Sequence, residues 1–363
     1  MNGNTLDKEW AVVTSFLPAD WRHLARTTGA MRRARGQIRD PDTLLQVLLM
    51  HVATGLSLKQ AVARAHIQGL ASITDVALLL RLRSSGAWLQ ELARRMFEAS
   101  RFAREQPPSV GGRRLRAVDA TTVEEPGATG TDWRVHYCVS LPDMRCDFYE
   151  VTDERGGETY KRVPIARGDI VLGDRGYCHR EGVAHVLRHE GDVVVRLTST
   201  GFPLIRPRTD EAFELLPHLR ALAGCAPGEW SVRFVAAGKT WNARLCGVRK
   251  SEVAAERAKK KLIQAAAKKQ KKPLPQTLEF AEYVMVLTTL SRADAETHEV
   301  LQLYRARWQI ELCFKRLKSL LHLGHVPKRS DTSARAWIEG KLLTVMLIER
   351  LIEEARLFSP WGF

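Results

Sequence analysis

The sequence predicts a mixed α/β sheet flanked by helices, preceded by a region made of helices alone. Three observations carry this prediction. Apolar positions in residues 5–100 follow helical spacing almost throughout. From Leu115 onward the chain changes to short segments rich in β-branched and aromatic residues, bounded by glycine, proline or aspartate. Three such segments follow one another and then alternate with a helical one, an order that indicates a mixed sheet.

The N-terminal helical region contains recognisable helix boundaries. Apolar residues recur at helical spacing from Leu44 on, and Gly55 ends that segment. Ser57 is placed to cap the next helix, and later helices are expected over Leu78–Arg83 and Trp88–Phe97. Short helices broken at glycines and rich in arginine are typical of a DNA-reading helix-turn-helix, and equally of a bundle with a solvated basic face. The arginines concerned are Arg32, Arg33, Arg35, Arg64, Arg81 and Arg83.

The sheet is expected to begin with three consecutive strands and to continue with a strand on either side of a helix over Glu181–His189. Composition alone does not tell which of these strands are neighbours. The five expected strands are Leu115–Val123, His136–Leu141, Cys146–Thr152, Asp169–Leu172 and Val193–Leu197.

Residues 198–280 have a looser pattern, with prolines and glycines between strand-like segments at Trp230–Val235 and Thr240–Val248. Ser251–Lys272 is rich in alanine and lysine, which indicates either a solvated helix or a nucleic-acid contact. Tyr283–Leu290 returns to strand character, and a long helix follows. The expected domains are a helical, DNA-binding one (1–104), the first part of a catalytic core (113–197), a β-rich and basic insertion (198–280) and the rest of the core (281–363), with Glu105–Gly112 as a linker.

The charge balance points to a polyanionic partner. The chain has 363 residues, with 56 Lys and Arg against 41 Asp and Glu, for a net charge of +15. Such an excess favours binding to phosphate backbones, although a membrane-surface protein would show it too. No apolar run approaches the length of a membrane span, the start lacks signal-peptide features, and the cysteines form no CxxC pair. These features favour a bacterial cytoplasmic, nucleoid-associated protein with reduced thiols and no membrane partner.

Two aspartates stand in positions that favour chemistry. Asp119 lies inside an otherwise apolar strand, where a carboxylate is costly unless it is paired or binds a cation. Asp174 follows the apolar segment Ile170–Leu172, at the end of a strand where α/β sheets build their sites. For either residue alone, a capping or ion-paired aspartate is the simpler interpretation.

A third acidic residue lies on the long helix after the last strand. If Leu301–Leu321 is one continuous helix, a single carboxylate lies on a narrow arc among cations and a phenol, beside an apolar face. This suits one metal ligand flanked by groups that bind phosphate, although a helix face with i,i+4 ion pairs such as Arg307 with Glu311 has the same pattern. The arc contains Tyr304, Arg307, Glu311, Lys315 and Lys318.

Together the three carboxylates predict a metal site. Asp119, Asp174 and Glu311 are hard oxygen donors that can hold two Mg²⁺ or Mn²⁺ ions, one activating a water or 3′-OH and the other stabilising the leaving oxygen. The absence of a His/Cys cluster disfavours Zn²⁺. His185 and His189 are spaced by four residues but lack a third ligand nearby, so they are interpreted as ordinary helix residues.

These stretches resemble the DDE transposases of the IS4 group, over roughly residues 113–345. The resemblance rests on AVDATTV around Asp119, VLGDRGY around Asp174, and YRARWQIELCFKRLK around Glu311. The last stretch matches the Tyr-x2-Arg-x3-Glu-x6-Lys signature of that group in full, at Tyr304, Arg307, Glu311 and Lys318.

The resemblance implies an RNase H-like core with a β-rich insertion, metal-dependent cleavage at transposon ends, and strand transfer into target DNA. The implied partner is double-stranded DNA, namely terminal inverted repeats and target, bound by a homodimer. Two alternatives stay open, a truncated copy that only binds DNA and an RNase H-like nuclease. Trp230 or Trp241 is a candidate for contact with a flipped base, or for core packing. The expected DNA contacts are Tyr304, Arg307, Lys315, Lys318 and Arg175.

Overall fold

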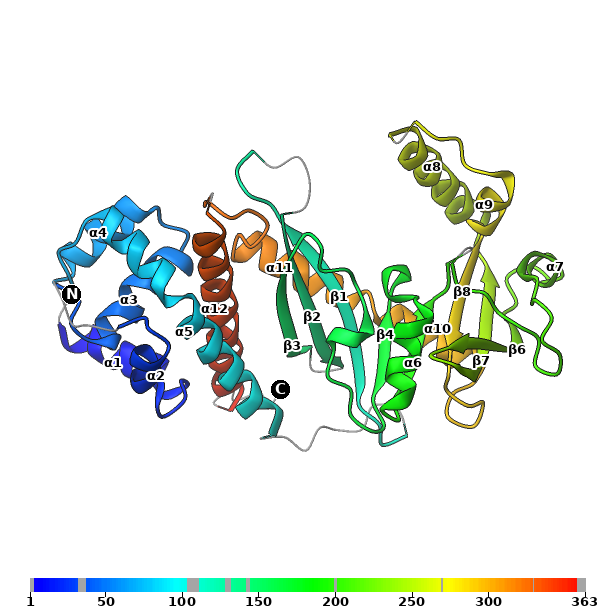
Figure 1. Ribbon diagram of the computed structural model, residues 1–363, viewed down its shortest axis with the longest axis horizontal. Coiled ribbons are helices and arrows are strands. Elements are labelled where there is room, and N and C mark those ends of the chain that lie inside the picture. The colour runs from blue at the N-terminus through cyan, green and yellow to red at the C-terminus, as the bar shows by residue number, and fades with distance from the viewer. Residues whose placement is uncertain are drawn as a thin grey trace.

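The computed structural model describes residues 3–31, 37–102, 111–127, 132–141, 144–198, 201–268, 270–328 and 330–357. The molecule is elongated, with helices at one end, a sheet in the middle and a second group of strands and helices at the other end (Figure 1). Arg32, Arg33, Arg35, most of the expected linker and Lys269 lie outside the described residues. No helix within the described ranges is both long enough and apolar enough to cross a bilayer.

The N-terminal region is helical, as expected. Gly55 has φ +74° just after the helix that it ends, and Ser57 forms a capping box with Gln60. Arg64 is exposed on its helix. Both interpretations of this region stay open, a DNA-reading helix-turn-helix and a bundle with a solvated basic face. The helices are α1 (Gly3–Ser15), α2 (Trp21–Thr27), α3 (Pro41–Val52), α4 (Leu58–Ile67) and α5 (Asp75–Phe102).

The expectation of two separate helices over 78–83 and 88–97 is wrong, because both segments belong to the single helix α5. Gly86 lies between them without breaking the helix. A Cβ atom at Gly86 would lie 3.3 Å from the Cβ of Ala336 in the C-terminal helix α12 (Asp331–Leu357). The glycine therefore lets two long helices approach closely, and Arg83 donates a hydrogen bond to Ser333 at the same contact.

The sheet has eight strands in the order β3-β2-β1-β4-β5-β8-β7-β6. β1, β2 and β3 are antiparallel neighbours, and β4 and β5 join them in parallel. This five-strand part has the RNase H-like strand order, so the predicted fold class is confirmed. The strands are β1 (Leu115–Val123), β2 (Trp133–Leu141), β3 (Arg145–Asp153), β4 (Ile170–Gly173), β5 (Asp192–Arg196), β6 (Gly228–Ala236), β7 (Lys239–Arg249) and β8 (Tyr283–Thr288).

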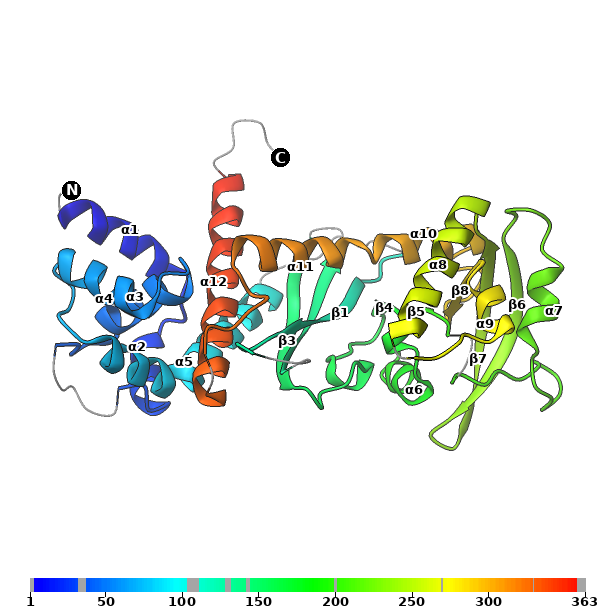
Figure 2. The same cartoon turned by 90° about the horizontal axis from the view of Figure 1, so that it is seen from above.

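The strands of residues 198–280 extend the same sheet. β8 pairs antiparallel with β5 and with β7, so β6 and β7 continue the central sheet outward instead of forming a separate one (Figure 2). The helices that follow β3 along the chain, α12 apart, cover the sheet or project from it. They are α6 (Arg180–Arg188), α7 (Leu215–Arg220), α8 (Glu252–Lys268), α9 (Pro275–Phe280), α10 (Thr297–Ala306) and α11 (Gln309–Leu320), with short 3₁₀ turns at Tyr160–Arg162 and Arg175–Tyr177.

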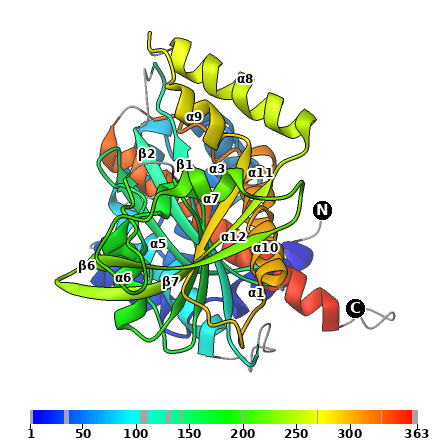
Figure 3. The ribbon, with the colours of Figure 1, turned by 90° about the vertical axis from the view of Figure 1, so that its right-hand side faces the viewer.

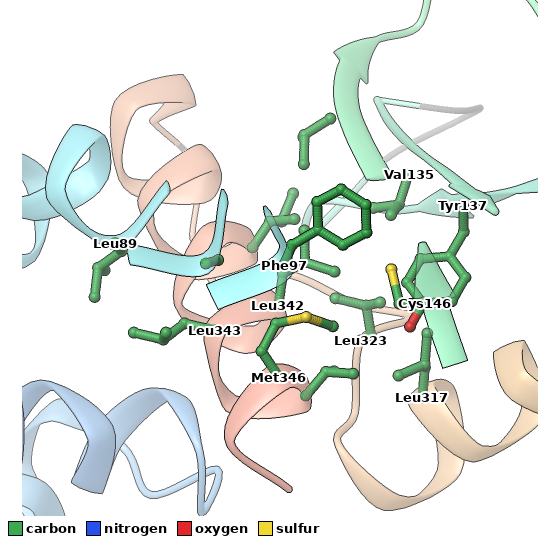
Figure 4. Packing of buried hydrophobic residues seen from close by; sticks show 14 of the residues in the cluster. Leu89, Phe97, Val135, Tyr137, Cys146, Leu317, Leu323, Leu342, Leu343 and Met346 are labelled. Atoms are coloured by element: carbon green, nitrogen blue, oxygen red, sulfur yellow. The ribbon is translucent and has the colours of Figure 1, made fainter. Parts of the chain in front are cut away.

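The largest core cluster joins the helical end to the sheet. Figure 4 shows Phe97 of α5 and Met346 of α12 packed toward Val135 and Tyr137 on β2. Leu317 of α11 belongs to the same cluster. A second cluster fills the other face of the sheet. Burial of this apolar area at roughly 25 cal/mol per Å² holds the helical end against the core.

A buried ionic network fixes the strands that carry the two aspartates. Arg116 on β1 is 1% exposed, pairs with both carboxylate oxygens of Asp147 on β3, and donates to Asp169 at 3.0 Å. Arg114 binds Asp169 through two hydrogen bonds of 2.7 Å. Burial alone would raise the pKa of Asp147, but the attraction of Arg116 outweighs it and the pKa is lowered. Asp169 directly precedes β4, so the network joins β1, β3 and the start of β4.

We expect Arg116→Leu to destabilise the fold by about 3–5 kcal/mol, because it leaves the buried carboxylate of Asp147 without its bidentate partner and removes one of the donors to Asp169. Chemical denaturation measures the free energy of unfolding. Arg155→Ala removes an arginine that is 88% exposed and should change that free energy by less than about 0.5 kcal/mol. Similar losses in the two variants would contradict a special role for the buried network.

Candidate active site

The parallel pairing of β1 with β4 brings Asp119 and Asp174 together. The register pairs Leu115 with Ile170 and Ala117 with Leu172. Two residues further along each strand the same register reaches Asp119 and Asp174, and the backbone of Asp174 is still extended, with φ −83° and ψ −167°. Residues two apart on a strand share a face, so both carboxylates lie on the same face, at the end of β4.

The expected continuous helix over residues 301–321 is wrong at one point. α10 ends at Ala306 and α11 begins at Gln309. Between them, backbone N–H groups bond to carbonyls three residues earlier, including Trp308 to Arg305 and Glu311 to Trp308. This tighter, 3₁₀-type turn shifts the phase of the following residues relative to a regular α-helix. The two helices still run on in nearly one direction across the sheet (Figure 2).

The helix break places Arg307 between two of the three predicted metal ligands. Its guanidinium Nη2 donates to Glu311 Oε1 at 2.6 Å, and Nη1 lies 3.5 Å from Asp119 Oδ2. The Arg307 side chain is 12% exposed, whereas that of Glu311 is 58% exposed. The i,i+4 ion pair that the sequence left open is therefore formed, and it also reaches the buried aspartate.

A fourth carboxylate, which the sequence analysis missed, lies beside the aspartates. A Cβ atom on Gly176 would lie 1.8 Å from Glu158 Oε2 and 3.1 Å from Asp174 Oδ1, so both oxygens border this glycine. Glu158 is half-buried, and within the described part of the chain it makes no hydrogen bond or ion pair. It lies in the loop between β3 and the turn at Tyr160–Arg162, where no helical or strand periodicity is present, so the sequence carries little signal for it.

The site holds more negative charge than its surroundings stabilise. Burial is the largest of the effects that together raise the pKa of Asp119 to about 7. The neighbouring carboxylates of Asp174 and Glu158 act in the same direction, and the Ala120 N–H and Arg307 oppose them. Burial and Asp174 likewise raise the pKa of Glu158. A group of partly desolvated carboxylates favours binding of a cation.

The donor set suits a hard divalent cation, because every candidate ligand is a carboxylate. Nevertheless, among the described residues no three acidic, histidine or cysteine side chains are grouped so that they could hold a metal ion. Asp119 and Asp174 are brought together, but Glu311 is paired with the guanidinium that separates it from Asp119. A cation site made of all three would therefore require Arg307 to release its two partners.

The other expected DNA contacts surround this site. Arg307 lies over the ring of Tyr304, with 5.8 Å between the guanidinium carbon and the ring centroid. Arg175 directly follows Asp174. Lys315 and Lys318 are exposed on α11 and have no acidic partner within the described ranges. The solvent-facing cations of α11 are thus available to an anion.

The two tryptophans of the outer strands are used in packing. The Trp230 ring on β6 lies tilted against the ring of His218 and fills the space beside Gly247. The Trp241 indole N–H donates to the carbonyl of Ala236. Trp308, which the sequence analysis did not single out, is instead 52% exposed beside Arg307. Its position in the helix break, which helical spacing does not predict, is what exposes it.

Comparison with known proteins gives consistent results. Residues 111–347 match the family model described as Transposase DDE domain. The chain is 34% identical to the protein InsL of insertion sequence element IS186A from Escherichia coli K12, over 97% of this chain and 96% of that protein. It is also 34% identical to the transposase for insertion sequence element IS421 from Escherichia coli, with the same coverage.

Two solved structures are more distant. A piggyBac transposase synaptic complex with hairpin DNA aligns with a TM-score of 0.46 at 10% identity, covering 96% of this chain and 82% of that chain. The catalytic domain of human endonuclease V aligns with a TM-score of 0.30 at 12% identity, covering 64% of this chain and 97% of that chain.

We expect Glu158→Gln to be more stable than the parent protein in EDTA at mildly alkaline pH, because it removes one of three crowded negative charges. The melting temperature should rise by about 2 °C, the shift that roughly 1 kcal/mol produces in a large domain. Thermal unfolding followed by circular dichroism measures it. Glu154→Gln, at a position 55% exposed and four residues earlier, should leave the melting temperature unchanged. Equal shifts of the melting temperature in both variants would mean that the effect comes from the change in net charge and not from crowding at the site.

Proposed function

The chain belongs to the transposase DDE domain family, and on this basis we propose that it cuts DNA at the ends of an insertion sequence and joins the 3′ ends to target DNA. The observation that carries the proposal is the register of β1 with β4, which sets Asp119 and Asp174 side by side with Glu311 on the helix above them. The proposed setting is the bacterial cytoplasm, with terminal inverted repeats and target DNA as partners and a homodimer as the active form.

We propose that Asp119, Asp174 and Glu311 hold two Mg²⁺ or Mn²⁺ ions when DNA is bound. When bound, these ions would supply Lewis-acid activation of the attacking oxygen and stabilisation of the leaving oxygen. Asp119 is the central ligand in this proposal, because its carboxylate is largely buried and borders both neighbouring acids. Asp119 would hold the cations against the sheet, because it is itself part of β1.

Arg307 is proposed to exchange its partners when DNA enters. In the DNA-free chain its guanidinium neutralises Asp119 and Glu311, and its Nε atom is buried without a hydrogen-bond partner in the described structure. A DNA phosphate offers this planar fork a bidentate partner. Transfer of Arg307 to the phosphate frees both carboxylates for cations, so the acidic site would become complete only with substrate in place.

The cations of α11 are proposed to hold the same DNA. Lys315 and Lys318 are exposed and separated by three residues, so both project from one side of the helix that carries Glu311. Tyr304, on the preceding helix, would position the DNA near the cut phosphate, and Arg175 would contact the backbone next to Asp174.

Asp119→Asn is expected to lose cleavage of end DNA, because the amide keeps the shape of the side chain but lacks the ligand charge. The loss of cleavage activity should exceed the ~10–100-fold that is typical when a residue that only supports a metal ligand is mutated. Cleavage of a labelled duplex with Mg²⁺ is measured on gels, and DNA affinity by fluorescence anisotropy, where the variant should match the parent. Asp153→Asn, an exposed aspartate at the end of β3, should cut normally. Full cleavage by Asp119→Asn would assign that residue a structural role.

The same assays on the parent protein distinguish the alternative functions. Cutting without strand transfer would favour a nuclease, and binding without cutting would favour a protein that only binds DNA.

Lys318→Ala should weaken DNA binding about equally for all sequences and lower the salt slope of log K by about 0.9, the value of one phosphate contact. Its melting temperature should not change, because Lys318 has no acidic partner in the described structure. Arg316→Ala is the matched control, since Arg316 lines a different groove, against α12, with Leu320 and Ile348. A loss of stability with unaltered DNA binding would make Lys318 a structural residue.

A further inference from the structure

A strongly basic groove of about 920 Å³ lies between α8 and the outer part of the sheet. We call it the α8 groove. Its lining includes aliphatic side chains from α8, such as Val253 and Leu262, but no acidic and no aromatic residue of the described chain. The cations that line it come from β4, β5, β7 and α8 or the residues next to them, and they are Arg175, Arg196, Lys250, Arg257, Lys260 and Lys261.

Apolar packing does not explain why α8 stands over this groove. Of its 17 residues only Ala255 is buried, and Val253 is 62% exposed. Figure 3 shows α8 projecting from the end of the sheet. The helix is held near its middle by an ion pair of 2.9 Å between Lys259 and Glu282. Most helices in proteins are stabilised by burial of an apolar face, so this one lacks the usual partner.

The basic residues of α8 face the groove as a set. Arg257, Lys260 and Lys261 are separated by three and four residues, which places them on one side of the helix. They face Lys250 and Arg196 across the groove. Burial, together with the positive charges of Arg196 and Arg175, lowers the pKa of Lys250 to about 8. The repulsion within this set is relieved by an anion.

The α8 groove also leads to the candidate active site. A second groove of about 620 Å³ shares Arg196 and Val284 with it and is lined by Tyr304, Arg307 and Trp308. At the other side, Arg175 follows Asp174 directly in the chain. Cations therefore continue without interruption from the carboxylates to α8.

We propose that the α8 groove binds the sugar-phosphate backbone of DNA where the DNA extends outward from the candidate active site. The occupant is polyanionic, because six cations face it without an acid, and the aliphatic lining suits deoxyribose. The contact is independent of sequence, because contacts from lysine and arginine side chains to phosphates carry no sequence information. This inference rests on the proposed function in one respect, namely that the substrate is DNA.

The test compares two triple variants that each remove three positive charges from the same segment. Arg257→Ala/Lys260→Ala/Lys261→Ala empties one wall of the groove, and Lys268→Ala/Lys271→Ala/Lys272→Ala removes exposed lysines that do not line it. Alanine favours helix, so α8 is retained, which circular dichroism checks. Binding is titrated against salt with two duplexes, one carrying the terminal repeat of the element and one of scrambled sequence.

The groove variant should lower the salt slope of log K by about 2–3, because each lost phosphate contact removes about 0.9. The loss should be equal for both duplexes, and the control variant should lose less than about 1. Equal losses in the two variants, or a loss confined to the terminal repeat, would overturn the proposal. If the parent protein binds but never cuts DNA while the groove variant alone loses binding, the proposed function fails and this inference stands. If the parent cuts and the groove variant keeps the parental slope, only this inference fails.

Discussion

The parallel register between β1 and β4 is the constraint on which the site depends. A slip of one residue would turn Asp119 to the opposite face of the sheet and separate it from Asp174. The register is enforced away from the site, where Arg116 joins Asp147 and Asp169 in a buried network at the start of both strands. Stability at one end of the strand pair therefore supports the arrangement of the carboxylates at the other end. Crowded carboxylates are tolerated there because the frame is already fixed.

Most of the fold could be predicted because its elements have strong local signals. The five core strands were expected within a few residues of their observed bounds, since β-branched runs bounded by glycine or proline mark strands well. The helix α5 was predicted as two because Gly86 was interpreted locally, whereas its role is the close contact with Ala336, some 250 residues away. The place of β6 and β7 in the central sheet is also a long-range fact, fixed by the pairing of β8 with both β5 and β7.

The candidate site could be predicted as a set of residues but not as a geometry. Asp119 and Asp174 could be predicted because a carboxylate in or directly after an apolar strand is unusual. Glu311 could be predicted because it is the single carboxylate among the cations on its side of the helix. Helical spacing could not show that Arg307 lies in a break and separates Glu311 from Asp119. Glu158 was missed because its loop has no periodicity, and its role depends on Gly176, a residue that only the folded chain brings close. The contacts of Arg307 with Asp119 and of Glu158 with the aspartates join segments that are distant in sequence.

The pairing of α5 with α12 also determines how a newly made chain must fold. α5 leaves the ribosome early, whereas α12, which covers the apolar side chains of Leu89 and Phe97, follows some 230 residues later (Figure 4). Contacts between segments so far apart form slowly, because a long loop must close before they gain anything. During that time the apolar side of α5 is exposed to other chains and to chaperones. The joint that holds the finished molecule together is therefore its most vulnerable surface during synthesis.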